Sequence, residues 1–194
     1  DTFCNWASLA FQPYFTATAG NVGYAYWSHD IGGHQPGKVN PELYTRWVQF
    51  GVFSPILRTH TSKNEAAERR IWMFPPENFK AMREAFRFRY ELIPYIYTMA
   101  RKCHDTALPL CRPLYYEWPE LDEAYNHPGQ YMFGDDLLVA PITQPANSIT
   151  GYAEENGIDL IVIASHRPGL QDFFLGSTAA RVVRHAAAAV HVMR

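Results

Sequence analysis

The stretch "YAYWSHDIGGH", residues 24–34, decides the predicted fold, because an aromatic segment passes directly into an acid, two histidines and a glycine pair. We predict a short buried strand over residues 22–27 that delivers Trp27 and Asp30 at its C-terminal end. A buried strand without a further role would end at its apolar residues. Because this one continues into charge and then into a turn, we expect a functional site where the strand ends.

A second segment further along the chain follows the same order. The run "VFSPILR", residues 52–58, is predicted as a strand, His60 follows it, and residues 41–51 predict a helix between the two strands. Alternating strands and helices are typical of an α/β barrel, in which functional residues follow the C-terminal ends of the strands. We therefore expect Trp27, Asp30 and His60 to lie together past the ends of adjacent parallel strands.

Helices and then strands are predicted in the rest of the chain before residue 147. In chain order these are a helix over residues 4–18 that ends or kinks at Pro13, a helix from Pro76 to about Lys102 that kinks or splits at Pro94, and strands within residues 110–119 and 131–142. Proline lacks the backbone N–H that a helix interior uses, which is why it marks an end or a kink.

Composition and charge exclude several classes of function. The 17 basic and 19 acidic residues leave a net charge of −2, so neither nucleic acid nor an anionic membrane is an expected partner. No apolar run is long enough to span a membrane and no signal peptide is recognisable, so we expect a soluble chain of unknown compartment. The three cysteines are predicted as free thiols, and the scattered histidines predict no metal site and no cofactor.

The composition changes near residue 150. All five tryptophans lie at or before Trp118, whereas the tail is rich in Ala, Val, Ile and Gly. We predict two neighbouring parallel strands over residues 158–164 and 189–193, because an apolar run on consecutive residues suits a strand covered on both faces. A helix over residues 176–186 is predicted to join them in a right-handed crossover.

Residues 1–147 carry a series of motifs that resembles family 31 glycoside hydrolases, the retaining α-glucosidase and α-xylosidase group. The motifs, in order, are "DTFCNWASLAFQPYF", "YWSHDIGGH", "ELYTRWVQFGVFSPILRTH", "RYELIPYIYTMA", "CRPLYYEWP" and "GDDLLVAPI". The resemblance implies a carbohydrate substrate, the C-terminal portion of a (β/α)8 barrel over residues 1–105, and the start of a β-domain over residues 106–151.

The resemblance also implies roles for single residues. Asp1 corresponds to the general acid/base, Asp30 and His60 to residues that hold the sugar in the −1 subsite, and Trp27 and Arg58 to walls of that pocket. A carboxylic acid must protonate the leaving oxygen, while acceptors and an aromatic face hold the ring. The family's nucleophile lies upstream of the acid/base residue, and no other acid here matches its motif. We therefore expect the chain alone to be inactive.

Simpler roles remain open for each of these residues. Asp1 is a suitable helix N-cap, Asp30 suits a turn, and His60 suits a hydrogen-bonded loop. The abundant aromatic residues also suit a core. The loop "AAERRIW" departs from the family pattern, because many members carry Arg-Glu-Pro-Trp there. Only the ordered set of motifs favours the glycosidase interpretation over these alternatives.

Residues 152–194 resemble the C-terminal part of a universal stress protein, a doubly wound α/β family in which some members bind ATP. The family's nucleotide loop needs glycines so that backbone amides can approach the phosphates. Here Ala164 stands where the first glycine is expected, the loop is one residue short, and Gly176 and Ser177 remain. We favour a helix start and cap at Gly176 and Ser177 over ATP binding.

The predicted fold class is thus α/β: part of a (β/α)8 barrel with the start of a β-domain, followed by a doubly wound βαβ unit. By lineage the function is hydrolysis of α-linked glucosides or xylosides. A nucleotide-binding module and a structural chimera without activity are the alternatives. The junction fits an engineered fusion, a natural recombinant or a gene-model artefact equally well, and the oligomeric state is open.

Overall fold

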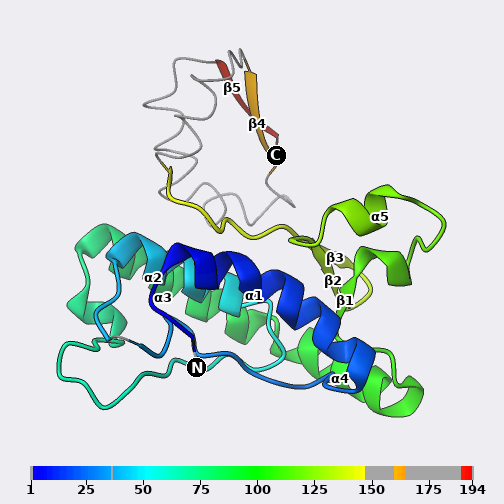
Figure 1. Cartoon of the computed structure of the whole chain (residues 1–194), viewed down its shortest axis with the longest axis horizontal. Coiled ribbons are helices and arrows are strands. Elements are labelled where there is room, and N and C mark those ends of the chain that lie inside the picture. Colours follow the sequence, from blue (N-terminus) through cyan, green and yellow to red (C-terminus); the bar gives the residue numbers. More distant parts are fainter. Residues whose placement is uncertain (1, 36, 147–159, 165–188, 194) are drawn as a thin grey trace.

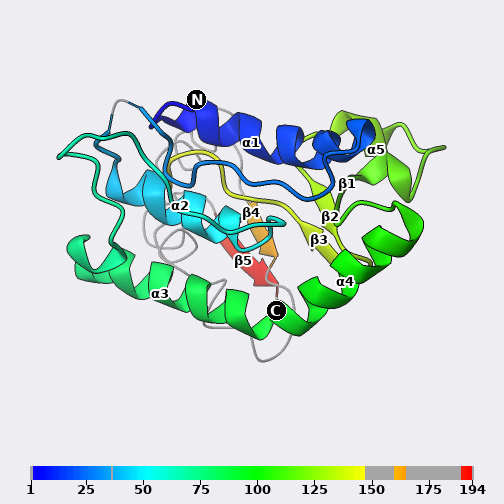
Figure 2. The ribbon, with the colours of Figure 1, turned by 90° about the horizontal axis from the view of Figure 1, so that it is seen from below.

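The structure is a computed structural model that describes residues 2–35, 37–146, 160–164 and 189–193 (Figure 1). Up to residue 106 it is mainly helical, with these elements in chain order: α1 (Trp6–Thr18), η1 (Ala19–Val22), α2 (Pro41–Gly51), η2 (Ile71–Met73), α3 (Pro76–Glu91) and α4 (Ile93–Thr106). Helix α2 lies between α1 and α3 (Figure 2). In the described part of the chain, no helix combines the length and the apolar character that a membrane span requires.

Local sequence explains where these helices begin and end. The side chain of Asn5 caps α1 by accepting a hydrogen bond from the Ser8 amide at 2.8 Å. Asn40 caps α2 in the same way, and Pro41 occupies the first turn, where its missing N–H costs nothing. The helix predicted from Pro76 splits just before Pro94, because α3 ends at Glu91 and α4 begins at Ile93. That split confirms the prediction.

A small antiparallel sheet follows the helices and packs against α1 and α4. Its strands, in spatial order, are β1 (Cys111–Pro113), β2 (Tyr131–Phe133) and β3 (Leu137–Val139), with η3 (Leu114–Tyr116) and α5 (Glu123–Asn126) between the first two. Gly134 begins the β2–β3 turn with a φ of 65°, and a β-carbon there would collide with the ring and hydroxyl of Tyr95. The strands expected within residues 110–119 and 131–142 are therefore present.

The hydrophobic core is built around α2, whose side chains face both neighbouring helices and the sheet. Its largest fully buried side chains are Trp47, Tyr44, Tyr131, Phe50 and Phe133. Edge-to-face ring pairs join the layers, with Phe50 at 6.3 Å from Tyr131 and Phe53 at 5.8 Å from Phe133. Such pairs contribute about 0.5–1.5 kcal/mol each beyond the area that they bury. The helices and the sheet thus share one core.

The loop after α2 is held by a single arginine of α3. The Arg89 guanidinium donates hydrogen bonds to the carbonyl oxygens of Val52, Ser54 and Pro55 at 2.5, 2.6 and 2.8 Å. Burial lowers the pKa of this guanidinium, because it removes water from the charge. Arg89 therefore fixes the chain that leads from α2 to Arg58 and His60.

Two strand predictions were wrong. Residues 22–27 and 52–58 form no strand, and the nearby parallel pairing in the described chain consists of isolated bridges such as Ile31 with Thr59. Pro55 interrupts the second run, because proline cannot donate to a strand ladder. In the first run Gly23 adopts a left-handed φ of 85°, and Tyr24 is 68% exposed. The helix predicted over residues 4–18 does form, as α1, and it continues past the buried Pro13.

In the tail, strands β4 (Leu160–Ala164) and β5 (Ala189–Met193) pair in parallel, with Leu160 opposite Ala189 and Ala164 opposite Met193. This pairing confirms the predicted parallel strands for the described part, residues 160–164 and 189–193. The helix predicted over residues 176–186 lies outside the described residues, so the complete doubly wound unit stays a prediction.

We predict that Arg89→Met lowers the free energy of unfolding by about 2–3 kcal/mol, because three buried carbonyls lose a charged donor. Arg89→Lys should recover only part of the loss, since one ammonium cannot reproduce the planar fork of the guanidinium. Urea denaturation of the whole chain measures the change. The control is Arg87→Met, an exposed arginine on the same helix that should change stability by less than about 0.5 kcal/mol. Equal stability of the two methionine variants would contradict the role given to Arg89.

Candidate functional site

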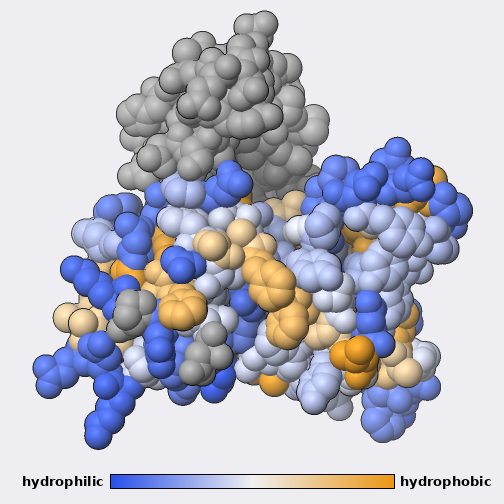
Figure 3. All heavy atoms as spheres, in the orientation of Figure 1, coloured by the Kyte–Doolittle hydropathy of each residue, from blue (hydrophilic) through white to orange (hydrophobic). Residues whose placement is uncertain are grey.

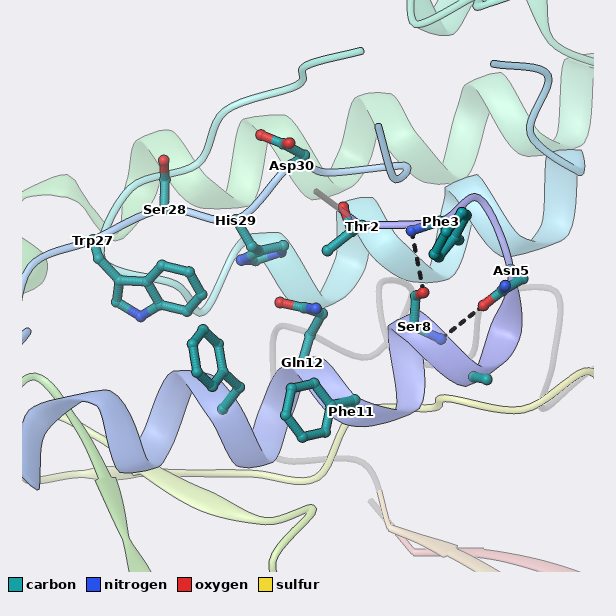
Figure 4. A pocket seen from close by; sticks show the side chains of 12 residues that line it. Thr2, Phe3, Asn5, Ser8, Phe11, Gln12, Trp27, Ser28, His29 and Asp30 are labelled. Atoms are coloured by element: carbon teal, nitrogen blue, oxygen red, sulfur yellow. Dashed lines mark hydrogen bonds between the residues drawn. The ribbon is translucent and has the colours of Figure 1, made fainter. Parts of the chain in front are cut away.

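A cavity of about 630 Å³ lies between α1 and the segment 27–30 (Figure 4). Its lining residues are Thr2, Phe3, Asn5, Ala7, Ser8, Phe11, Gln12, Phe15, Trp27, Ser28, His29 and Asp30. Hydrophobic side chains are interspersed with polar ones over the α1 face of the molecule (Figure 3). The cavity therefore combines aromatic walls with groups that can form hydrogen bonds, a combination typical of ligand sites.

The aromatic wall comes from both sides of the cavity. The Trp27 ring meets Phe15 edge to face, with ring centroids 5.0 Å apart. Phe15 in turn stacks on Phe11, one helical turn earlier on α1, at 5.6 Å. These contacts hold the Trp27 ring in the wall of the cavity.

Several polar atoms along this cavity are buried and lack a hydrogen-bond partner among the described residues. They are Thr2 Oγ1, Gln12 Oε1, Trp27 Nε1 and both ring nitrogens of His29. Buried polar groups in folded proteins almost always have partners, so a group of orphans at one cavity points to a polar ligand. The sequence did not single out Thr2 or Gln12, although both lie within the first motif, because the resemblance implies a role there only for Asp1.

His29 is a buried and uncharged part of the cavity wall. It is only 4% exposed, and its ring lies 4.8 Å from that of Phe50 in the core. Burial, with a smaller effect of the nearby Arg58 charge, lowers the pKa of His29 to about 3. The ring is therefore neutral near pH 7, and it can donate one hydrogen bond and accept another without acting as a charged group.

Asp30 is held by two segments of the chain. Its Oδ1 accepts a hydrogen bond from Arg58 Nη2 at 2.7 Å, and its Oδ2 lies 3.5 Å from His34 Nδ1. The Ile31 amide donates to the Arg58 carbonyl at 3.3 Å within the isolated parallel bridge. The His34 and His60 rings lie 5.1 Å apart. The structure thus brings Asp30, Arg58 and His60 together, although no regular strand carries them.

The glycine pair after Asp30 makes this arrangement possible. Gly32 and Gly33 have φ values of 96° and 80°, a region that residues with a side chain rarely adopt. A β-carbon on Gly33 would lie 2.7 Å from the Phe3 carbonyl oxygen. The Arg69 guanidinium donates to the carbonyls of Gly32 and Gly33 at 3.3 and 2.7 Å. The tight turn therefore returns the chain so that the side chain of His34 lies beside Asp30.

Three of the predicted site residues lie outside the described residues. These are Asp1, Gly176 and Ser177. The helix cap offered as an alternative role for Asp1 is provided by Asn5, so that alternative is wrong for α1.

Family comparisons divide the chain into three matches. The model described as the glycosyl hydrolases family 31 TIM-barrel domain matches residues 1–99, and the family 31 C-terminal domain matches residues 107–156. The universal stress protein family matches residues 141–194. The last two matches overlap at the composition change near residue 150.

Curated relatives agree with the family 31 matches. The chain is 34% identical over 145 residues to neutral alpha-glucosidase C of Homo sapiens, and 37% identical over 142 residues to an alpha-xylosidase of Emericella nidulans. These alignments cover 75% and 71% of this chain, but only 16% and 18% of the relatives. The chain thus spans less than a fifth of the length of these two relatives.

Solved structures show the same relationship. A GH31 alpha-xylosidase from a soil metagenome, complexed with xylose, superposes with a TM-score of 0.69 at 32% identity over 74% of this chain and 24% of that one. A Flavobacterium johnsoniae GH31 dextranase, complexed with glucose, gives a TM-score of 0.66 at 38% identity over 72% of this chain and 18% of that one. The helical region is therefore a TIM-barrel fragment followed by a small β-domain, and the chain belongs to glycosyl hydrolase family 31.

Proposed function

We propose that this chain carries part of the sugar-binding site of a glycoside hydrolase that acts on α-linked glucosides or xylosides. The observation that carries the proposal is the Asp30 carboxylate, which is fixed by Arg58 beside His60 and lines a cavity with an aromatic wall. Xylose and glucose are present in the two similar enzyme structures described above, which supports a sugar of this class.

Each residue of the proposed site has a physical role. The carboxylate of Asp30 accepts hydrogen bonds from sugar hydroxyls, and charge-assisted bonds of this kind are stronger than neutral ones. His60 supplies a second polar contact from the neighbouring segment. Trp27 offers a flat apolar surface to a sugar ring, and Arg58 orients the Asp30 carboxylate.

The chemical step requires groups beyond this set. We assign the general acid/base role to Asp1 by its position in the family motif. A retaining hydrolase needs two carboxyl groups about 5–5.5 Å apart, one acting as acid/base and one as nucleophile. Asp30 is the one acid among the described residues that line the cavity, and its ion pair with Arg58 suits binding rather than attack.

The proposed domain division follows the family matches. Residues 1–105 form the barrel portion, residues 106–151 the start of the β-domain with the junction, and residues 152–194 a stress-protein-like βαβ segment. The parallel pairing of β4 with β5 supports the last assignment. A right-handed helical crossover between these strands would make the segment a doubly wound unit.

We predict that Asp30→Asn weakens binding of glucose or xylose to the 194-residue chain by about tenfold or more, because a charged acceptor is worth about 1.5–3 kcal/mol. Ligand-observed NMR titration measures the affinity. The matched control is Asp105→Asn, which removes another aspartate that is paired with an arginine, here Arg101 at 2.8 Å, away from the cavity. Sugar binding that is equal in the two variants would refute the assignment of Asp30.

We also predict that the 194-residue chain alone does not hydrolyse aryl α-glucosides or α-xylosides, because no acid besides Asp30 lines the cavity among the described residues, and none in the sequence matches the nucleophile motif. Release of the aryl group, followed by absorbance, is the measurement. Turnover above the buffer rate that disappears in Asp1→Asn would contradict the prediction and would show that the chain contains a complete catalytic pair.

The stress-protein match favours nucleotide binding as a second candidate function. Ala164, the last residue of β4, stands where the family loop carries its first glycine, the residue type that lets backbone amides approach phosphate. Gly176 and Ser177 are the remaining loop residues, and we propose for them a helix start rather than an ATP contact.

Isothermal titration of the chain with ATP tests this second candidate. We expect no binding at micromolar concentrations, where a dissociation constant of 1 μM would correspond to about −8 kcal/mol. Ala164→Gly should leave the result unchanged, because the shortened loop still cannot present its amides. Micromolar binding by the unmodified chain would instead support a nucleotide-binding module.

A further inference from the structure

Three side chains that are common metal ligands meet at the end of the glycine turn. Asp30, His34 and His60 each offer one ligand atom, and these atoms all lie within 4.8 Å of one another. We propose that they bind a divalent cation of the Zn²⁺ class. From the sequence we expect Asp30 and His60 to lie together, but not His34 with them, because the histidines show no regular spacing.

The distances fit a tetrahedral ion after small side-chain movements. Zn²⁺ binds nitrogen and oxygen at about 2.0–2.2 Å, which places two tetrahedral ligands about 3.3–3.5 Å apart. Asp30 Oδ2 and His34 Nδ1 are already 3.5 Å apart. His60 is exposed, so its ring can turn to complete the set. The His34 and His60 ring centroids are 5.1 Å apart, with the ring planes tilted by 31°.

His34 is the most firmly placed of the three ligands. Its backbone amide donates to the Thr2 carbonyl at 2.7 Å, and its carbonyl accepts from the Ser62 amide at 3.1 Å. Its Nδ1 is buried and has no hydrogen-bond partner in the described chain. A metal ion would provide the partner that this nitrogen lacks. Because the backbone of His34 is already held by hydrogen bonds, binding would cost little conformational entropy there.

Arg58 affects the site in two opposite ways. It donates a hydrogen bond to Asp30 Oδ1 at 2.7 Å, while Asp30 Oδ2 lies beside His34. Residues that hydrogen-bond to a metal ligand often orient it in this way. Its positive charge also repels a cation at this distance. We therefore expect binding weaker than at a closed structural zinc site, with the fourth position open to water or to a ligand.

The ligand set favours one class of ion. Two imidazoles and one carboxylate suit Zn²⁺ and its transition-metal neighbours, whereas Mg²⁺ and Ca²⁺ prefer oxygen ligands throughout. The proposal shares Asp30 and His60 with the proposed sugar site but does not depend on it. Metal binding is measured without sugar, so its failure would leave the sugar-binding proposal intact.

Isothermal titration of the 194-residue chain with Zn²⁺, and separately with Mg²⁺, tests the proposal. We expect one Zn²⁺ site and no heat from Mg²⁺. His34→Phe should weaken Zn²⁺ binding at least about 100-fold. Mutating residues that only hydrogen-bond to a metal ligand already lowers metal affinity about 10–100-fold, and His34 is itself a proposed ligand. Should His34→Phe fail to fold by circular dichroism, the exposed His60→Ala provides the same test.

A matched control separates this site from adventitious surface binding. His104 pairs with Asp105 at 3.0 Å but belongs to no group of three such ligands in the described chain. His104→Ala should therefore retain full Zn²⁺ affinity. Visible absorption of a Co²⁺ complex that is lost in His34→Phe or His60→Ala, but kept in His104→Ala, would support the assignment. Unchanged Zn²⁺ affinity in a folded His34→Phe or His60→Ala variant would overturn it.

Discussion

The ion pair between Asp30 and Arg58 is the interaction on which the candidate site depends. It joins two segments 28 residues apart, and the backbone bridge between Ile31 and Thr59 lies directly beside it. Surface ion pairs usually contribute little to stability, but the carboxylate of this one is largely enclosed, and the pair fixes its orientation. Removing either partner would leave the backbone bonds between these segments but would free the Asp30 carboxylate to change orientation.

Support for this pair comes from residues well away from it along the chain. Arg69 holds the carbonyls of the glycine turn that follows Asp30, and Arg89 holds those of the loop that precedes Arg58. Each arginine uses its planar fork to satisfy several carbonyl groups that no helix or sheet satisfies. Arginine side chains therefore replace, around the site, part of the hydrogen bonding that regular strands would supply in a complete barrel.

The sequence predicted the helices better than the strands. Caps and prolines act locally, which is why α2 and the break between α3 and α4 follow from the residues themselves. A parallel strand instead depends on a neighbouring strand for its hydrogen bonds, and in residues 22–27 and 52–58 Gly23 and Pro55 prevent a regular ladder. The meeting of His34 with His60 could not be predicted either, because it arises from the left-handed turn at Gly32 and Gly33 and from pairing between distant segments.

The burial of His29 has a thermodynamic consequence for the cavity wall. Folding lowers its pKa from an ordinary value near 6.5 to about 3, so between these values the unfolded chain holds a proton that the folded chain does not. The stability of the fold therefore decreases as the pH falls below 6.5, and this loss grows until about pH 3. Unfolding in this range takes up a proton at His29. Acid thus opposes the packing of the imidazole between Trp27 and Phe50 in the wall of the cavity.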